Sequence, residues 1–167
     1  YIGRLGDGSN QNDGIYILLK EVVDNSVDEF IMGAGKKINI TINDDGSVQV
    51  RDFGRGIPLG KIVDCVSTIN TGAKYNTEVF QFSVGLNGVG TKAVNALSDV
   101  FTVTSFRDGL FSSALFNNGK LVEQKDGTSE EKNGTLIEFL PSREMFADFT
   151  FDLSYVDQRL WRYAYLN

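Results

Sequence analysis

The sequence predicts an α+β fold with a single sheet and helices packed on one of its faces. Apolar residues recur at helical spacing across residues 13–32, whereas apolar and polar residues alternate across residues 37–43, as in a half-buried strand. Further strand candidates lie between residues 100 and 124, where Asp108-Gly109 and Asn117-Asn118-Gly119 mark the turns of an antiparallel meander. Strands that cluster beside helices in this way favour one sheet covered on one side.

The elements before residue 71 are bounded by residues that start helices, end helices or form turns. Asp13 can cap the first helix, and Gly33 and Gly35 end it. Asp44-Asp45-Gly46 forms a turn between two strands. In chain order, this half is expected to contain a helix at 13–32, strands at 37–43 and 47–52, and a short helix at 59–69.

The second half opens with residues 71–87, which lack clear periodicity and are predicted to form a mobile loop. Residues 126–133 are polar and are predicted to connect two strands. The other expected elements are a helix at 91–97, strands at 100–107, 110–116, 120–124 and 135–140, and a terminal helix at 153–165.

The composition excludes several classes of function. The chain has 167 residues, no histidine and one cysteine, which excludes Ser-His and Cys-His catalysis, histidine metal ligands and an intrachain disulfide. With a net charge of −6, the chain lacks the excess of basic residues that general nucleic-acid binding requires. We find no signal peptide and no apolar run of membrane-spanning length. Cys65 lies among apolar residues at helical spacing and is predicted to pack in the core.

The first chemically informative motif is Glu21-Val-Val-Asp-Asn25, within the first predicted helix. Glu21 and Asn25 share one helix face because they are one turn apart, and Asp28 continues the polar stripe. A carboxylate can orient and deprotonate a water that attacks a terminal phosphate, and an amide oxygen suits Mg²⁺. The alternative interpretation is an ordinary solvated helix face.

The second motif, Asp52-Phe-Gly54-Arg-Gly56-Ile-Pro58, places a carboxylate at the end of a predicted strand. An ionised carboxylate only accepts hydrogen bonds, so Asp52 can recognise the amino group of adenine, where guanine carries a carbonyl. Gly54 and Gly56 allow the backbone to approach a base closely. Alternatively, Asp52 simply opens a tight turn.

The third motif is the glycine-rich stretch 85–90, immediately before the helix predicted at 91–97. Backbone amides at a helix start can cradle a phosphate, and Lys74 could add a positive charge. Residues 88–93 also fit the G-x-G-x-x-A pattern of dinucleotide-binding enzymes, with Asp108 about twenty residues further on. The segment before them is a poor candidate for a buried strand, which disfavours that alternative. The sequence contains no P-loop motif.

In this order, the three motifs resemble those of the GHKL ATPases, the family of DNA gyrase B, topoisomerase IV B, Hsp90, MutL and the sensor histidine kinases. The longer match from Tyr1 to Ser98 resembles the bacterial type II topoisomerases. Residues 6–9 and 58–71 look more like topoisomerase IV B than gyrase B. The resemblance implies the GHKL (Bergerat) ATPase fold, a two-layer α+β sandwich whose mostly antiparallel mixed sheet carries helices on one face.

The resemblance also implies roles for individual residues. Glu21 would be the general base, and Asn25 would be the magnesium ligand. Glu29 and Arg55 would pair beside the adenine pocket, with Arg107 at its mouth, where aminocoumarin inhibitors bind in the family. Thr135 would share an adenine-bound water with Asp52. The residues implied for nucleotide binding are Asn25, Asp52, Gly54, Arg55, Gly56, Ile57, Pro58, Lys74, Gly88, Val89, Gly90 and Thr135.

At the level of the whole molecule, the resemblance implies that residues 1–167 are a single N-terminal ATP-binding domain of a larger cytoplasmic protein. The family places a dimerising arm before Tyr1 and a catalytic lysine after Asn167. ATP and Mg²⁺ would be the cofactors. DNA (through other domains), topoisomerase IV A or gyrase A, and a second copy of the same protein would be the partners, with no membrane. The alternatives are a gyrase B, a chaperone or mismatch-repair ATPase, and a pure protein-binding module.

Overall fold

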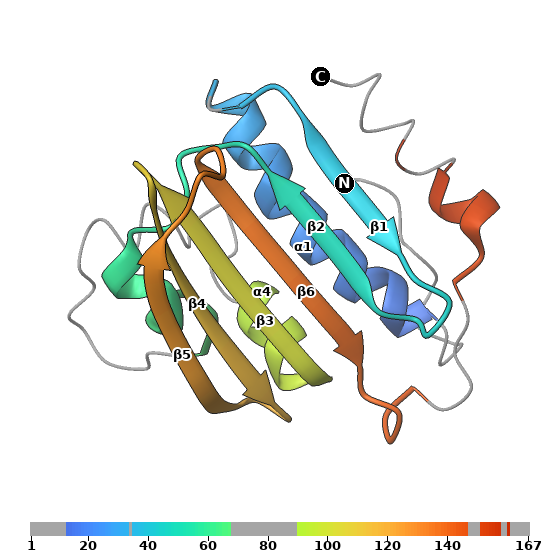
Figure 1. The fold of residues 1–167 in the computed structure, drawn as a ribbon. Coiled ribbons are helices and arrows are strands. Elements are labelled where there is room, and N and C mark those ends of the chain that lie inside the picture. The colour runs from blue at the N-terminus through green and yellow to red at the C-terminus, as the bar shows by residue number, and fades with distance from the viewer. Residues whose placement is uncertain (1–12, 34, 68–89, 147–150, 158–159, 161–167) are drawn as a thin grey trace, which may run out of the picture.

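The computed structural model describes residues 13–33, 35–67, 90–146, 151–157 and 160, and these form a sheet with helices packed against one face (Figure 1). The helices lie behind the sheet in this view, with α1 behind β1, β2 and β6 and α4 behind β3. The helical elements are α1 (Asp13–Ile31), η1 (Leu59–Lys61), α2 (Ile62–Ser67) and α4 (Gly90–Ala96). The strands are β1 (Ile38–Ile42), β2 (Val48–Asp52), β3 (Ser98–Arg107), β4 (Leu110–Asn117), β5 (Lys120–Thr128) and β6 (Gly134–Pro141). The predicted α+β architecture with a single-sided sheet is confirmed.

The strand order is β1-β2-β6-β3-β4-β5, so the last strand in sequence is inserted between β2 and β3. Each pairing among the described strands is antiparallel, where the resemblance implied a mostly antiparallel mixed sheet. Ile137 of β6 lies opposite Val50 on one side and Val103 on the other. The start of β6 therefore lies beside the end of β2, where the second motif begins.

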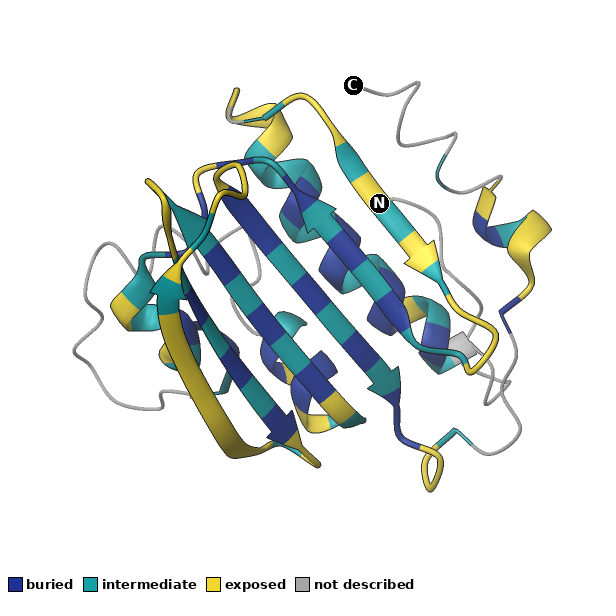
Figure 2. Cartoon of the chain, in the orientation of Figure 1, coloured by how far each residue is buried: buried dark blue, intermediate teal, exposed yellow. Residues whose placement is uncertain are grey.

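The core fills the space between the sheet and the helices. Buried and half-buried residues alternate along β2, β3, β4 and β6, as Figure 2 shows, because successive side chains point to opposite faces of a strand. Phe101 and Phe116 pack edge to face with their ring centres 6.1 Å apart. From α1, the core receives Ile15, Leu18, Leu19, Val22 and Val23.

Cys65 is buried in α2, which confirms its predicted place in the core. Burial raises the pKa of its thiol to about 11, so the thiol is protonated at neutral pH and a poor nucleophile. Among the described residues, we find no helix with the length and apolarity needed to cross a bilayer.

Two sequence predictions need correction at the level of elements. β5 continues to Thr128, although the strand was expected to end at residue 124 and residues 126–133 were expected to be a connection. β5 lies at the edge of the sheet and is exposed along most of its length, so its sequence lacks the alternation that marks a half-buried strand. Its backbone pairing with β4 defines it, with Leu110 opposite Thr128.

The second correction concerns the short helix predicted at 59–69, whose first turn is the tighter 3₁₀ helix η1. Of the predicted terminal helix, residues 153–157 and 160 are helical. The segment 71–87, predicted to be a mobile loop, lies outside the described residues.

The dinucleotide-binding interpretation of residues 88–93 is wrong. That fold requires parallel strands around the glycine-rich turn, whereas α4 leads into β3, which pairs with both of its neighbours in the antiparallel direction.

Candidate functional site

The polar stripe of α1 faces α4, which partly covers it. Glu21 and Asn25 are half-buried. A Cβ atom added to Gly90 would lie 2.1 Å from Oε2 of Glu21, so the bare backbone of Gly90 packs directly on this carboxylate. In the next residue, the Thr91 hydroxyl accepts a hydrogen bond from Nδ2 of Asn25. The first motif and the end of the third are therefore in contact.

The carboxylate of Asp52 is buried on the helix side of the sheet, and several donors hold it. Oδ1 accepts hydrogen bonds from the backbone N–H groups of Gly54, at 3.0 Å, and Thr135, at 3.1 Å. Oδ2 accepts from the Ser26 hydroxyl at 3.2 Å. Burial raises the pKa of Asp52, and the hydrogen bonds from Gly54 and Thr135 act in the opposite direction. The result is an oriented acceptor in a low-dielectric environment.

The turn after Asp52 lies against the end of β3. Gly56 has φ of 76°, and a Cβ atom there would lie 2.6 Å from the Phe106 carbonyl oxygen, so both backbone geometry and space require glycine. The Ser105 hydroxyl donates a hydrogen bond of 2.6 Å to the carbonyl of Ile57. Gly54 and Ile57 are buried, and Pro58 is half-buried. These contacts fix the turn that carries most of the second motif.

The predicted pair of Glu29 and Arg55 is present. Nη2 of Arg55 lies 2.7 Å from Oε1 of Glu29, while Nε and the backbone N–H of Arg55 both donate to Oε2 at 3.2 Å. These hydrogen bonds raise the pKa of Arg55. Cγ of Arg107 lies 2.8 Å from the position of a Cβ atom on Gly56, so Arg107 sits beside the same turn.

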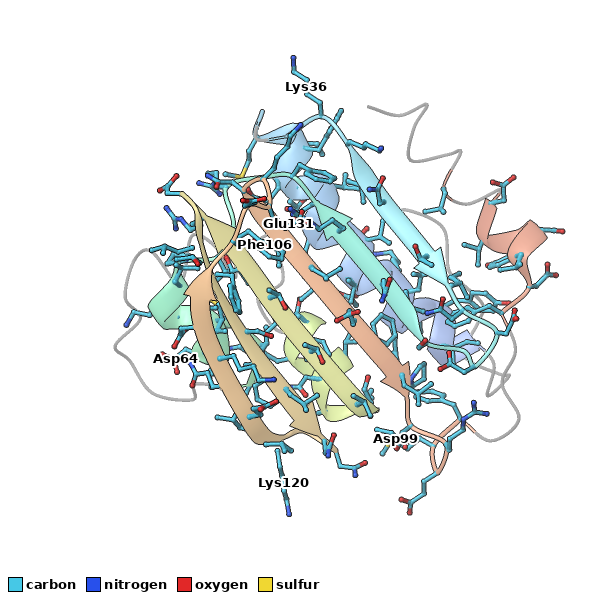
Figure 3. The ribbon with its side chains drawn as sticks, in the orientation of Figure 1. Lys36, Asp64, Asp99, Phe106, Lys120 and Glu131 are labelled. Carbon is cyan, nitrogen blue, oxygen red and sulfur yellow. The ribbon has the colours of Figure 1, made fainter. Side chains whose placement is uncertain are left out.

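Arg51 reinforces this region from the opposite face of the sheet, and sequence reasoning missed it. Its guanidinium carbon lies 4.3 Å from the centre of the Phe53 ring and 4.7 Å from that of Phe106. It donates to the carbonyls of Asp52 and Lys132 and lies 3.7 Å from a carboxylate oxygen of Glu131. Figure 3 shows Phe106 and Glu131 at this end of the sheet. Arg51 thereby holds the backbone of Asp52 on the face away from its carboxylate.

Three other residues with contacts to the site were also missed, namely Ser26, Thr91 and Ser105. One signal could have identified Ser26, because it is a polar residue on the apolar side of α1, three and four residues after Val23 and Val22. Thr91 and Ser105 gave no comparable signal, since their partners lie far away in the sequence. Of the predicted site residues, Lys74, Gly88 and Val89 lie outside the described part of the chain.

The polar groups around Asn25 fit a magnesium ion that arrives together with a ligand. Among the described residues, no donor reaches Oδ1 of Asn25. The same part of the chain holds no cluster of three or more His, Cys, Asp or Glu residues able to bind a metal. A cation here would take the amide oxygen, phosphate oxygens and waters, which is the coordination that Mg²⁺ favours.

Comparison with known proteins identifies the family. The model of the family described as "Histidine kinase-, DNA gyrase B-, and HSP90-like ATPase" matches residues 10–144. The DNA topoisomerase 4 B protein of Borreliella burgdorferi is 57% identical over 167 residues, which are 100% of this chain and 28% of that protein. The DNA gyrase B protein of Rickettsia bellii is 36% identical, covering 100% of this chain and 21% of that protein.

A solved structure gives the same result. The 43K ATPase domain of Thermus thermophilus gyrase B, in complex with an aminocoumarin, superposes with a TM-score of 0.73 and 36% sequence identity, covering 92% of this chain and 41% of that chain. This similarity confirms the predicted GHKL fold. The chain spans less than a third of the length of the Borreliella and Rickettsia relatives. It belongs to the family of histidine kinase-, DNA gyrase B- and HSP90-like ATPases.

Proposed function

We propose that this chain is the ATP-binding and ATP-hydrolysing domain of a bacterial type II topoisomerase, in a topoisomerase IV B protein. The observation that carries this proposal is the convergence of separate motifs. Asp52 is an oriented buried acceptor, while Glu21 and Asn25 contact the start of α4 at Gly90 and Thr91. The identity of 57% to a topoisomerase 4 B protein, against 36% to a gyrase B, favours topoisomerase IV.

In this proposal Asp52 recognises the adenine amino group. Its Oδ1 already accepts from two backbone donors, whereas Oδ2 accepts from one donor among the described residues, the Ser26 hydroxyl, and so has a lone pair for the base. The turn formed by Gly54, Arg55, Gly56, Ile57 and Pro58 would line the base, and Thr135 would share a water with Asp52. A site built around an acceptor disfavours guanine, which has an acceptor at the same position.

At the other end of the site, Glu21 acts as general base. It would hold the attacking water and accept its proton, while Lys74, Gly88, Val89 and Gly90 bind the phosphates. Asn25 would hold Mg²⁺ through Oδ1. When bound, the ion neutralises the negative charge that develops on the phosphate oxygens.

Glu29, Arg55 and Arg107 form the proposed inhibitor pocket. The structure brings these three side chains to one turn, around Gly54 and Gly56. The similar Thermus gyrase B domain was solved with an aminocoumarin, which supports the same ligand class for this site. Arg55 is exposed and Glu29 is half-buried, and ion pairs near the surface contribute little to stability, so the arrangement of this pair fits a binding role better than a stabilising one.

We further propose that residues 1–167 act as one N-terminal domain of a longer cytoplasmic protein. Its partners would be topoisomerase IV A, DNA contacted through other domains, and a second copy of the same protein that pairs on ATP binding. Reconstitution of the full-length protein with topoisomerase IV A tests the choice between enzymes, because topoisomerase IV is expected to unlink DNA circles and gyrase to supercoil them.

Calorimetric titration of the chain with ATP, GTP and NAD, each with and without Mg²⁺, tests the nucleotide site. ATP is expected to bind in preference to GTP by about tenfold or more, since one charge-assisted hydrogen bond contributes about 1.5–3 kcal/mol. NAD is expected not to compete, and Mg²⁺ is expected to strengthen ATP binding. Equal affinity for ATP and GTP would remove the role of Asp52 in base recognition.

Gly90→Ala is expected to impair turnover through Glu21. The added methyl group would have to displace the carboxylate, because its position is 2.1 Å from Oε2. A displaced base loses much of its catalytic contribution, so ATP turnover by the full-length protein should fall at least about tenfold.

Gly60→Ala is the matched control for this variant, since a Cβ atom there meets nothing within 4 Å. It is expected to leave the turnover rate unchanged. Wild-type turnover in Gly90→Ala would show that the contact between Gly90 and Glu21 does not position the base.

A further inference from the structure

One contact in the site has no role in the proposed function so far, namely the hydrogen bond from Asn25 to Thr91. Nδ2 of Asn25, on α1, donates to Oγ1 of Thr91, on the first turn of α4. Both residues are half-buried, and the preceding residue, Gly90, packs on Glu21. Two consecutive residues of α4 therefore contact the two functional side chains of the α1 stripe.

The chemistry of an amide makes this contact consequential. An asparagine side chain presents an oxygen at one end and an amino group at the other, and only the oxygen can bind a cation. Rotation by half a turn about the last side-chain bond exchanges the two ends. A neighbour that pairs with the amino group therefore decides whether the oxygen is available.

Of the acidic residues near Asn25 on α1, Asp24 is paired with Lys20 and Glu29 with Arg55, while Asp28 lies one turn after Asn25. The pKa of Asp28 is raised by burial and then by the negative charges of Asp24 and Glu29, and the positive charge of Lys20 acts in the opposite direction. Carboxylates attract the amino end of an amide and repel its oxygen. The Thr91 hydroxyl, an acceptor on α4, holds the amino end on its own side before a cation arrives.

We propose that Thr91 is a positioning residue, whose hydroxyl holds the amino group of Asn25 so that Oδ1 is available to the divalent cation that accompanies the nucleotide. This inference rests on the proposed ATPase function. The cation binds more tightly because the amide does not need to reorient when it arrives. Partners of metal ligands commonly change metal affinity by about 10–100-fold when they are removed.

The test uses variants that separate the hydroxyl from side-chain shape. Thr91→Val replaces the hydroxyl by a methyl group, Thr91→Ser keeps it, and Thr91→Ala serves if the valine variant does not fold. Thr102→Val is a matched control, because Thr102 lies in β3, paired with Leu115 and Glu138 and away from α4. Asn25→Ala provides the reference for complete loss of the ligand.

Mg²⁺ is titrated calorimetrically into each variant saturated with a non-hydrolysable ATP analogue. The Kd for Mg²⁺ is expected to rise at least about tenfold in Thr91→Val and to stay near the wild-type value in Thr91→Ser and Thr102→Val. Binding of adenosine without metal is expected to stay unchanged in all four Thr variants, since Asp52 recognises the base.

Side-chain NMR of the ligand-free protein gives a second measurement. The two amino protons of the Asn25 side chain are expected to give distinct signals and to exchange slowly with water in the wild type and in Thr91→Ser. In Thr91→Val, their exchange with water is expected to be faster.

An unchanged Kd for Mg²⁺ in Thr91→Val would overturn the role of Thr91 and leave the proposed ATPase function intact. Equal losses of Mg²⁺ and adenosine binding would also overturn it, because they would indicate that Thr91 only packs the two helices together. A wild-type chain that binds no adenine nucleotide would overturn both proposals.

Discussion

Replacing Glu21 in the full-length protein is expected to reduce ATP turnover by at least about 100-fold, the lower limit for a general base. ATP binding should change by less than about threefold, because a base acts on the attacking water rather than on the nucleotide. Glu21→Gln is the sharper variant, since it keeps the side-chain volume that packs against Gly90, whereas Glu21→Ala also leaves a gap there. Phosphate release and equilibrium binding of a non-hydrolysable analogue measure the two effects separately.

Glu144→Gln is a suitable control for the loss of one negative charge, because Glu144 is exposed and follows β6 at the end remote from Asp52. It is expected to hydrolyse ATP at the wild-type rate. Normal turnover in both Glu21 variants would remove Glu21 from the mechanism. A parallel loss of nucleotide binding would instead indicate that Glu21 supports the fold of the site.

Asp52→Asn is expected to weaken ATP binding by about tenfold or more, as the loss of a buried charge-assisted hydrogen bond costs about 1.5–3 kcal/mol. The oxygen of the introduced amide can still accept from the backbone of Gly54 and Thr135, so the fold should survive. Asp52→Ala would leave both of these buried donors without a partner, at a cost of about 1–3 kcal/mol each. With that variant, a loss of folding stability could not be separated from a loss of base recognition.

The preference among bases gives the more specific result. The amide of Asp52→Asn presents a donor where the carboxylate presented an acceptor, so it should favour a carbonyl over an amino group. Inosine triphosphate carries that carbonyl in place of the amino group of ATP. The wild type is expected to prefer ATP, and the variant to lose or reverse the preference. An unaltered preference in competition binding would contradict the assignment of Asp52 to the amino group.

Much of the candidate site could be predicted from the sequence, because each of its motifs is a short continuous segment of the chain. The one-turn spacing of Glu21 and Asn25 is a property of any helix, and the apolar residues around them specify which side of α1 is buried. The alternation in β2 places Asp52 on the same face as Val48 and Val50, which is the helix side. Such patterns need only the geometry of one element, so they can be recognised without knowing what packs against it.

The remaining features depend on pairings between distant segments. The backbone N–H of Thr135 reaches Asp52 because β6 is inserted between β2 and β3, and no local pattern specifies that order. β5 was predicted too short because an exposed edge strand is defined by backbone pairing rather than by burial.

The sequence by itself therefore determined the α+β class, the faces of α1 and β2, and the identities of the residues that carry charge. Only the tertiary structure decided their partners, namely Ser26 for Asp52, Gly90 for Glu21, Thr91 for Asn25, and the rings of Phe53 and Phe106 for Arg51. The physical reason is that side-chain direction follows from the short period of a helix or strand, whereas a contact across the chain depends on strand order, register and helix packing, which the whole core sets together.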